Sequence, residues 1–241
     1  MNKINAAGLV GREINIRLGA KEGEWRIEDC CGQRFIGAGM SGRSIEIEGV
    51  PGNALGAYLD GGSITVWDNA QDAVGDTMNG GRIVIHGSVG DTAGYAMRGG
   101  EIYVRGNAGY RAGIHMKAYE NRIPALIIGG SAGSFLGEYQ AGGHIVVLGL
   151  GLEKNRQPVG DFACTGMHGG KLYLRGNCAE LHFPRQVEVR PAVQADIDEI
   201  RPQIERFSTL FGYAAREILD APFTVVQPDS STPYKQMYVA N

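Results

Sequence analysis

The stretch "MNGGRIVIHGSVGDTAGYAMRGGEIYVRGNAG", residues 78–109, contains nearly the same phrase twice. Gly80-Gly81 precedes Arg-Ile-Val-Ile, and Gly99-Gly100 precedes Glu-Ile-Tyr-Val 19 residues later. The first apolar residue of each such segment recurs along the chain. These residues are Ile45, Ile64, Ile83, Ile102, Leu126, Ile145 and Leu172, at steps of 19, 19, 19, 24, 19 and 27 residues. A repeat of this length is typical of solenoids, in which each repeat forms one coil that stacks on the next.

Each repeat contains a short strand in which apolar residues occupy alternate positions, the period of a strand with one buried face. The positions expected to point inward are Ile45/Ile47, Ile64/Val66, Ile83/Ile85, Ile102/Val104, Leu126/Ile128, Ile145/Val147 and Leu172/Leu174. A second column of the same register is Met40, Leu59, Met78, Met97, Met116 and Gln140. Because methionine adapts to uneven neighbours, this column is expected to fill the axis of the stack.

Glycines follow the same register and form the pattern G-x-x-G-x-x-x-G. The glycines that we assign to the structural repeat are Gly49, Gly52, Gly56, Gly75, Gly80, Gly87, Gly90, Gly94, Gly99, Gly106, Gly109, Gly113, Gly130, Gly133, Gly137, Gly142 and Gly169. An α-helix cannot carry them, since each interior glycine costs about 1 kcal/mol relative to alanine. Corners with positive φ and stacked corners without space for a Cβ explain them. We therefore predict an all-β protein, a parallel β-helix of about seven coils with a C-terminal helical cap.

The repeat suggests three regions. Residues 1–35 are expected to cap the β-helix, with "GREINIRLG" (residues 11–19) and "EWRIED" (residues 24–29) as short strands. Residues 36–182 are expected to form the repeat, and residues 183–241 a helical segment and tail. Helical spacing runs through residues 194–219, Gly212 separates two helices, and residues 222–228 form a last strand. In the polar tail after Ser230, Tyr234 and Tyr238 are candidate anchors.

The 19-residue spacing of the repeat is interrupted by two insertions. Extra residues occur near residues 118–122 and near residues 150–159, the latter including Lys154 and Arg156. Insertions in solenoids become loops that leave the rod. The second loop is expected to be dispensable for folding.

The outward positions of the strands form a second apolar stripe. These residues, a candidate interface, are Val84, Tyr103, Ile127, Val146 and Tyr173. A solvated face would be polar, as at Glu46 and Thr65, so this face is expected to be covered. We favour the apolar face of the C-terminal helix, which includes Ile200 and Phe207; the alternatives are a partner subunit or a second copy of this chain.

Composition argues against several classes of protein. The net charge of -3 argues against a nucleic-acid binder that relies on a basic face. No stretch approaches the roughly 20 apolar residues of a membrane helix, and the N-terminus lacks a run of signal-peptide length. Cys30, Cys31, Cys164 and Cys178 form no CxxC pair, which fits free thiols in a reducing cytoplasm.

Residues with catalytic chemistry are scattered, and we assign no catalytic, cofactor-binding or metal-binding residue. A strand, not a helix, follows each glycine pair, which favours turns over phosphate loops. Five acids, Asp60, Asp68, Asp72, Asp76 and Asp91, lie in neighbouring coils but are expected in different registers, which favours solvated corners over a polysaccharide-cleaving site.

Histidine and cysteine give no stronger signal. The histidines, His86, His115, His144, His168 and His182, show no HxxxH spacing, and surface positions are favoured over a metal site. Cys178 shares a column with Ala70, Val89, Ala108 and Ala132, which predicts a buried thiol.

Several of these segments resemble the C-terminal domain of the glutamate synthase large subunit. They are "GAGMSG" (residues 37–42), "GSAGSFLGEYQAGGHIVVLG" (residues 130–149), "GMHGGKLYLRGN" (residues 166–177) and the ending "FGYAAREIL" with "FTVVQP". The resemblance implies a right-handed β-helix, here as a stand-alone protein. In that family the glutaminase, flavin and iron–sulfur chemistry belongs to other domains.

The resemblance therefore implies a non-catalytic structural subunit of a cytoplasmic glutamate-synthase-type complex, in glutamate biosynthesis and nitrogen metabolism. Its expected partners are glutaminase-type and flavin/iron–sulfur synthase-type subunits, with no cofactor and no independent activity in this chain. The same β-helix is similar to subunits of N-methylglutamate synthase and formylmethanofuran dehydrogenase, which remain alternatives. A free-standing polysaccharide hydrolase or lyase is a further alternative.

Overall fold

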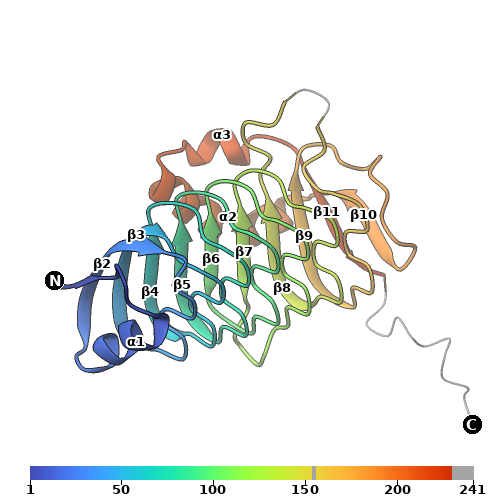
Figure 1. Ribbon diagram of the computed structural model, residues 1–241. Coiled ribbons are helices and arrows are strands. Elements are labelled where there is room, and N and C mark those ends of the chain that lie inside the picture. The colour runs from blue at the N-terminus through green and yellow to red at the C-terminus, as the bar shows by residue number, and fades with distance from the viewer. Residues whose placement is uncertain (154–155, 230–241) are drawn as a thin grey trace, which may run out of the picture.

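The computed structural model describes residues 1–153 and 156–229, which form a rod of stacked coils with helices packed on its outside (Figure 1). The strands are β1 (Asn2–Asn5), β2 (Gly23–Cys31), β3 (Arg43–Val50), β4 (Asp60–Val66), β5 (Gly80–Ile85), β6 (Glu101–Val104), β7 (Ala125–Ile128), β8 (Ala141–Val147), β9 (Gly169–Arg175), β10 (Val187–Pro191) and β11 (Phe223–Pro228). The helices are α1 (Gly11–Gly19), α2 (Gln194–Phe211) and α3 (Ala215–Leu219).

The strands form one sheet in the order β1-β2-β3-β4-β5-β6-β7-β8-β9-β11-β10, in which β1 to β9 are parallel. Ile45 pairs with Ile64, and the pairing continues through Ile83, Ile102, Leu126 and Ile145 to Leu172. The predicted parallel β-helix and its register are confirmed, also across both insertions. The inward pairs are buried in one core with the methionine column.

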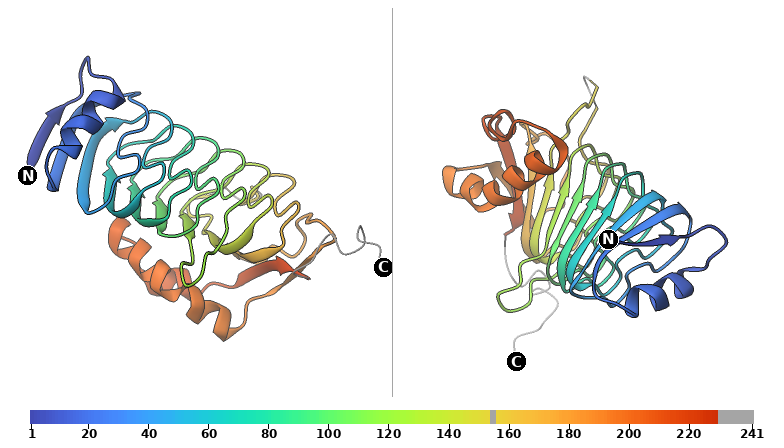
Figure 2. Two further views of the ribbon diagram at one scale, coloured as in Figure 1. Left: turned by 90° about the horizontal axis from the view of Figure 1, so that it is seen from below. Right: turned by 90° about the vertical axis from the view of Figure 1, so that its left-hand side faces the viewer.

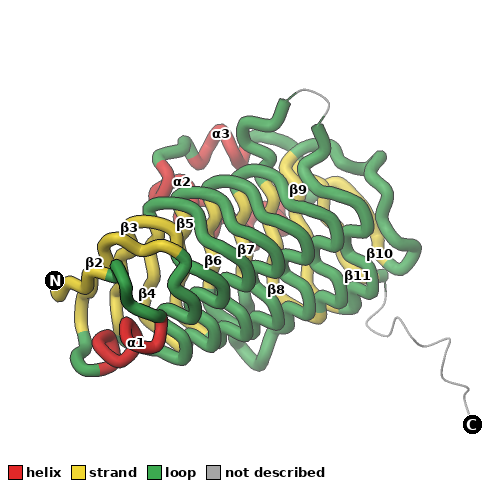
Figure 3. The backbone as a smooth tube through the Cα atoms, in the orientation of Figure 1, coloured by secondary structure: helices red, strands yellow, loops and turns green. Residues whose placement is uncertain are grey.

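The rest of each coil is loop, shown in green in Figure 3, and contains a corner with an unusual backbone. Three alternate residues of this corner have positive φ, and they form three columns along the rod. The first column is Phe35, Ala54, Ala73, Thr92, Arg111, Phe135 and Phe162; the middle column is Gly37, Gly56, Gly75, Gly94, Gly113, Gly137 and Cys164; the third column is Gly39, Tyr58, Thr77, Ala96, His115, Tyr139 and Gly166. Positive φ is uncommon outside glycine, so the stacking must stabilise it.

The alternation of positive and negative φ aims the corner N–H groups in opposite directions. In the first column, Ala54 N–H donates to Asp72 O of the following coil at 2.9 Å, and in the third, Tyr58 N–H donates to Asp76 O at 2.8 Å. The middle residue points backward, since Gly56 N–H donates to Ile36 O of the preceding coil at 2.8 Å. Each corner is therefore hydrogen-bonded to both neighbours, as a strand is in a sheet.

Several glycines of the middle column are also required for space. A Cβ on Gly75 would lie 2.5 Å from Ile102 Cδ1, a core side chain of strand β6. Cys164 tolerates a Cβ at this register because the last coil has no such isoleucine beyond it. Other repeat glycines have another reason: a Cβ on Gly109 or Gly133 would overlap the preceding coil.

The N-terminal prediction was wrong in one element. Residues 11–19 are helix α1, not a strand, because Gly11, Ile14 and Leu18 are buried at helical spacing while Ile16 is 62% exposed. Residues 24–29 lie in β2, as expected. Helix α1 covers the open end of the rod (Figure 1). Its Asn15 accepts from Gly37 N–H at 2.9 Å and donates to Phe35 O at 2.7 Å, so its amide replaces part of a preceding coil.

The C-terminal part ends the sheet with an antiparallel hairpin. Strand β11 pairs antiparallel with β9, and β10 pairs antiparallel with β11. The last strand and the helix end at Gly212 (φ 75) were predicted, whereas β10 was not. Pro202 lies inside α2 without ending it. Figure 2 shows α2 lying along the sheet side of the rod.

Both insertions are loops in the described residues. Near residues 118–122, Tyr119 and Arg122 form an isolated antiparallel bridge, and Arg122 reaches back to Asp60 at 3.4 Å. In the second insertion, residues 154–155, including Lys154, lie outside the described residues. Val159 resumes the small-residue column, pairing with Ala132.

A pair of substitutions tests the corner. Gly94 and Gly75 have φ near +70°, but the nearest atom to a Cβ on Gly94 is Leu126 Cδ2 at 3.6 Å. Gly94→Ala should therefore lower the free energy of unfolding by about 1–2 kcal/mol through backbone strain alone. Gly75→Ala should cost at least about 1 kcal/mol more, because its Cβ meets Ile102.

Urea denaturation measures both, with Thr77→Ala as the control because alanine already occupies its column at Ala96. Equal costs for the two glycine variants would contradict the assigned packing of the middle column.

Candidate interaction surfaces

The five outward apolar residues lie side by side on successive strands. Val84 pairs with Tyr103, Tyr103 with Ile127, Ile127 with Val146, and Val146 with Tyr173. All five are at most 3% exposed. They form a second apolar cluster with Ile200, Ile204, Phe207 and Phe211 of α2. The chain's own helix covers this stripe and leaves almost none of its surface for a partner or a second copy.

Glu199 of α2 is the centre of a polar cluster beside this apolar contact. Its carboxylate lies 2.9 Å from His144 Nε2 and 2.5 Å from Lys171 Nζ, and it accepts from the Tyr173 hydroxyl at 2.8 Å. These three partners come from β8 and β9, so one helix side chain ties α2 to two strands. Sequence reasoning missed this cluster because its members lie far apart in the chain without a repeated spacing.

Two further ion pairs hold α2. Asp196 accepts from Arg190 Nη1 at 2.6 Å and from Val193 N–H at 2.9 Å, so it binds β10 and also caps its own helix. Near the other end of the helix, Arg206 donates to Glu101 Oε2 of β6 at 2.6 Å.

The pKa shifts in this cluster follow from its burial and its partners. Burial lowers the pKa of His144, although the nearby Glu199 carboxylate opposes the shift. Burial opposes the charge of Glu199, but Lys171, Tyr173 and His144 together lower the pKa of that carboxyl. Burial and the Glu199 carboxylate raise the pKa of Tyr173. The guanidinium of Arg190 lowers the pKa of Asp196 to about 2.

A histidine, a carboxylate, a tyrosine and a lysine are the residue types of general acid–base catalysis. Here, however, Tyr173 is fully buried and His144 is 8% exposed, both beneath α2. A substrate has no surface on which to approach them. The cluster is best explained as the attachment of the helix to the sheet.

The expected separation of the acids was wrong for one pair. Asp72 and Asp91 share a register, and each carboxylate accepts a backbone N–H from the following coil: Asp91 N–H at 3.0 Å and Tyr110 N–H at 2.8 Å. Asn69 and Asn107 do the same in a neighbouring column. These side chains satisfy backbone donors at coil boundaries, which explains their positions without catalysis. Asp60, Asp68 and Asp76 lie in other registers.

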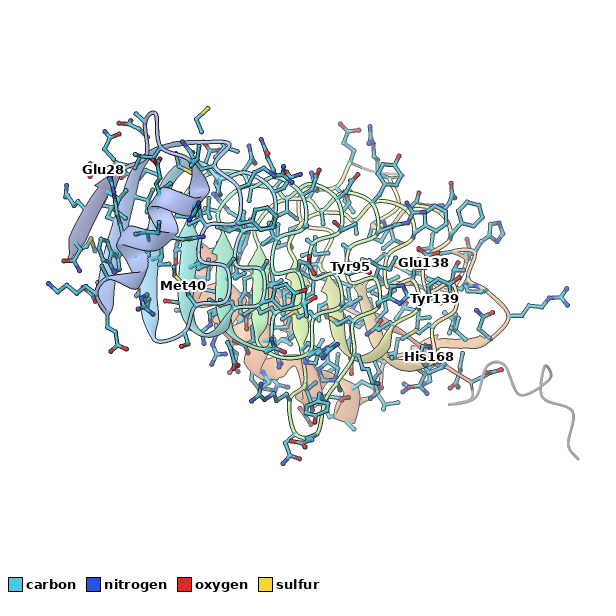
Figure 4. The ribbon with its side chains drawn as sticks, turned by 60° about the horizontal axis from the view of Figure 1, so that its bottom comes forward. Glu28, Met40, Tyr95, Glu138, Tyr139 and His168 are labelled. Carbon is cyan, nitrogen blue, oxygen red and sulfur yellow. The ribbon has the colours of Figure 1, made fainter. Side chains whose placement is uncertain are left out.

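Exposed aromatic rings gather at the corner of the last three coils. The rings of Phe135 and Phe162 stack with centroids 5.1 Å apart, and Arg111 lies over Phe135 at 4.8 Å. In the third column His115 stacks on Tyr139 at 5.2 Å. Figure 4 shows Tyr95, Glu138, Tyr139 and His168 on one side of the rod, in its C-terminal half. Phe162 is 60% and Tyr139 is 37% exposed, so both rings are accessible at this corner.

The other histidines and the cysteines show no combined site. His86 stacks on Trp67 at 4.2 Å, and His168 contacts Gly166 O at 3.1 Å. Within the described ranges, no three His, Cys, Asp or Glu side chains are grouped to hold a metal ion. Burial raises the pKa of Cys30 to about 11 and that of Cys164 to about 12, and Cys178 is also buried, so these thiols are unreactive.

Two shallow hollows lie at opposite ends of the rod. The N-terminal one, about 400 Å³, is lined by residues 9–12 and 31–35. The C-terminal one, about 310 Å³, is lined by Asp161, Phe162, Thr165, His182, Phe183 and Pro184.

The glycine corner identifies the family. The GXGXG motif family matches residues 4–228, almost all of the described chain. The chain belongs to that family. An uncharacterized protein of Methanocaldococcus jannaschii is 40% identical over 128 residues, which are 51% of this chain and 49% of that protein. The chain thus spans about half the length of this curated relative.

A solved structure shares the fold of this family member. It is the formyltransferase/hydrolase complex of Methylorubrum extorquens with methylofuran, one chain of which gives a TM-score of 0.63 at 23% identity. The match covers 83% of this chain and 71% of that chain. Among the described residues, no helix is long and apolar enough to cross a membrane.

Asp196 generates a pH prediction. Its pKa is depressed in the folded state, so its stabilising contribution is present above about pH 4 and is lost as pH falls from 4 towards 2. Asp196→Asn should lower the free energy of unfolding by about 1–2 kcal/mol at pH 7, and its difference from the parent should shrink as the pH falls through this range.

Chemical denaturation at pH 7, 4 and 3 measures this difference. Asp198→Asn, an exposed acid of the same helix, is the matched control and should change little at any pH. A cost for Asp196→Asn that does not depend on pH would refute the ionic account.

Proposed function

We propose that this GXGXG family member is a non-catalytic structural subunit of a multisubunit enzyme of the glutamate synthase type. The proposed partners carry the glutaminase, flavin and iron–sulfur chemistry, and this chain binds no cofactor itself. Family membership and the glycine-rich segments that resemble the glutamate synthase domain support the proposal. The unpaired cysteines support a reducing, cytoplasmic location.

The observation that carries this proposal is the contrast between buried chemistry and exposed contacts. The His144 and Tyr173 side chains of the acid–base cluster lie under α2, whereas aromatic rings are exposed along the corner of the last coils. The corner itself does not require these rings, since Thr77 and Ala96 occupy the column of Tyr139. Exposed tyrosine and phenylalanine are typical of protein interfaces. We propose that this corner contacts the partner.

A second candidate is a subunit of a formyltransferase/hydrolase or formylmethanofuran dehydrogenase complex. The observation that favours it is the shared fold with a chain of the formyltransferase/hydrolase complex over 83% of this chain. Both candidates give the chain a structural role and differ in the partners.

Purification of the tagged chain from its own cells tests the proposal. We expect stoichiometric partners with glutaminase-type and flavin/iron–sulfur sequences, identified by mass spectrometry, with flavin absorbance in the complex and none in the isolated chain. Formyltransferase- or hydrolase-type partners would instead support the second candidate. Turnover of a polysaccharide by the isolated chain would overturn both.

A matched pair of variants tests the proposed contact surface. Tyr139→Thr should reduce recovery of the partners at least about tenfold, the effect of losing roughly 1.4 kcal/mol. Tyr58→Thr, in the same column at the other end of the rod, should recover the partners as the parent does. Threonine is tolerated in this column at Thr77, so both variants should fold. Equal recovery with both variants would exclude the Tyr139 region as the contact.

A further inference from the structure

Two aromatic rings of the first corner column already lie under arginine side chains. Arg111 Cζ lies 4.8 Å from the ring centroid of Phe135, and Arg34 Cζ lies 5.4 Å from that of Phe35. The Arg111 guanidinium also pairs through Nε with Glu138 Oε2 at 3.3 Å. This guanidinium is thus held between a ring and a carboxylate, an arrangement that suits the planar and weakly hydrated charge of arginine.

The last coil repeats the ring and the carboxylate. Phe162 is the next ring of the first column, and it stacks on Phe135 with the exposed part of its side chain turned away from the stack. Asp161, directly before it, shares the register of Asp72, whose carboxylate accepts Asp91 N–H from the following coil. No further corner follows Asp161, because the columns of positive φ end with this coil. Within residues 1–153 and 156–229, its carboxylate has no hydrogen-bond or ion-pair partner.

Asp161 and Phe162 line the C-terminal hollow, which has a volume of about 310 Å³. The other lining residues are Thr165, His182, Phe183 and Pro184. Phe183 is partly buried against the core, so this part of the lining is held by packing. No arginine or lysine is among these described residues, and the Asp161 carboxylate gives the hollow a negative charge. The candidate anchors Tyr234 and Tyr238 lie outside the described residues.

The N-terminal hollow provides a contrast within the same chain. It also contains a ring of the first column, Phe35, but its lining includes Arg12 and Arg34, and Arg34 lies over that ring. The N-terminal hollow therefore carries its own guanidinium groups. Among the described residues, the C-terminal hollow has the ring and the acid without a cation.

We propose that the C-terminal hollow binds an arginine side chain of the partner subunit. This inference rests on the proposed function, in which the same corner contacts a partner. The guanidinium lies against the exposed face of Phe162 and pairs with Asp161, and its methylene groups contact Phe183 and Pro184. Lysine fits less well, because its compact ammonium is strongly hydrated and has no planar face to stack on a ring. An apolar side chain would cover the Asp161 carboxylate without supplying a counter-charge.

A titration of the isolated full chain tests the site without requiring a partner. Blocked arginine, N-acetyl-L-arginine methylamide, should shift the NMR signals of the Phe162, Thr165 and Phe183 amides, with a Kd in the millimolar range that rises with salt. Blocked lysine should bind at least about threefold more weakly. Absence of these shifts, or equal affinity for the two probes, would overturn the proposal.

A matched pair of variants assigns the binding to Asp161. Asp161→Asn should weaken the binding of blocked arginine at least about threefold, because it removes the charge of the carboxylate. Asp72→Asn is the control, since it makes the same change at the same register, where asparagine already occurs at Asn53. This control should bind blocked arginine as the parent does. Binding that Asp161→Asn leaves unchanged would place the probe elsewhere and refute the site.

Cross-linking in the assembled complex identifies the occupant. With His182 replaced by the photoreactive p-benzoylphenylalanine, the full chain should link to a partner peptide in which arginine lies at or beside the linked residue. A link to a peptide without arginine, or to a second copy of this chain, would contradict the proposal. If the parent chain recovers no partner at all, the proposed function is refuted, and with it the partner as the source of the arginine. The titration alone decides whether the hollow binds arginine, so the two failures are distinguishable.

Discussion

The alternating hydrogen bonds of the corner are the constraint on which the rest of this protein depends. A left-handed residue costs about 1–2 kcal/mol when it carries a Cβ, and here such residues recur in every coil at the first or third column. The cost is offset because the alternation aims successive N–H groups at the coils before and behind. A single corner could not be stable by itself. Stacking makes the strained backbone favourable, and the strained backbone sets the stacking register.

Because each coil depends on its neighbours, the two ends of the rod and the outer face of the sheet need other elements to cover them. A coil without a neighbour leaves backbone donors or acceptors unpaired. This chain meets that problem with elements outside the repeat: Asn15 of α1 at the first corner, the antiparallel strand β11 against β9, and α2 over the outward stripe. Antiparallel pairing also prevents a further parallel coil from continuing the sheet. Glu199 and Asp196 fix α2 where the apolar contact alone would leave its position less specific.

The sequence was informative wherever coils repeat, because one correct register predicts all the others. Ile64, Ile83 and Ile102 were placed in the core by their shared spacing alone. The repeat carries no information about elements that occur once. Ile14, Ile16 and Leu18 alternate as a strand would, and only burial against the first coil distinguishes the helix. The contacts of Glu199 needed the fold, since β8, β9 and α2 meet only after the chain has coiled.

Departures from a column carry the functional information in a repeat protein. A residue type that recurs is explained by the architecture, as Gly75 is by Ile102 and Asp72 is by the N–H of Asp91. A residue that differs from its column without a packing reason needs another explanation. Tyr139 and Phe162 lie in columns that also hold threonine and alanine, at exposed positions whose backbone is equally strained. The stack accepts smaller residues at both positions, so the exposed faces of these two rings, which otherwise stack on His115 and Phe135, are available for a contact beyond the coils.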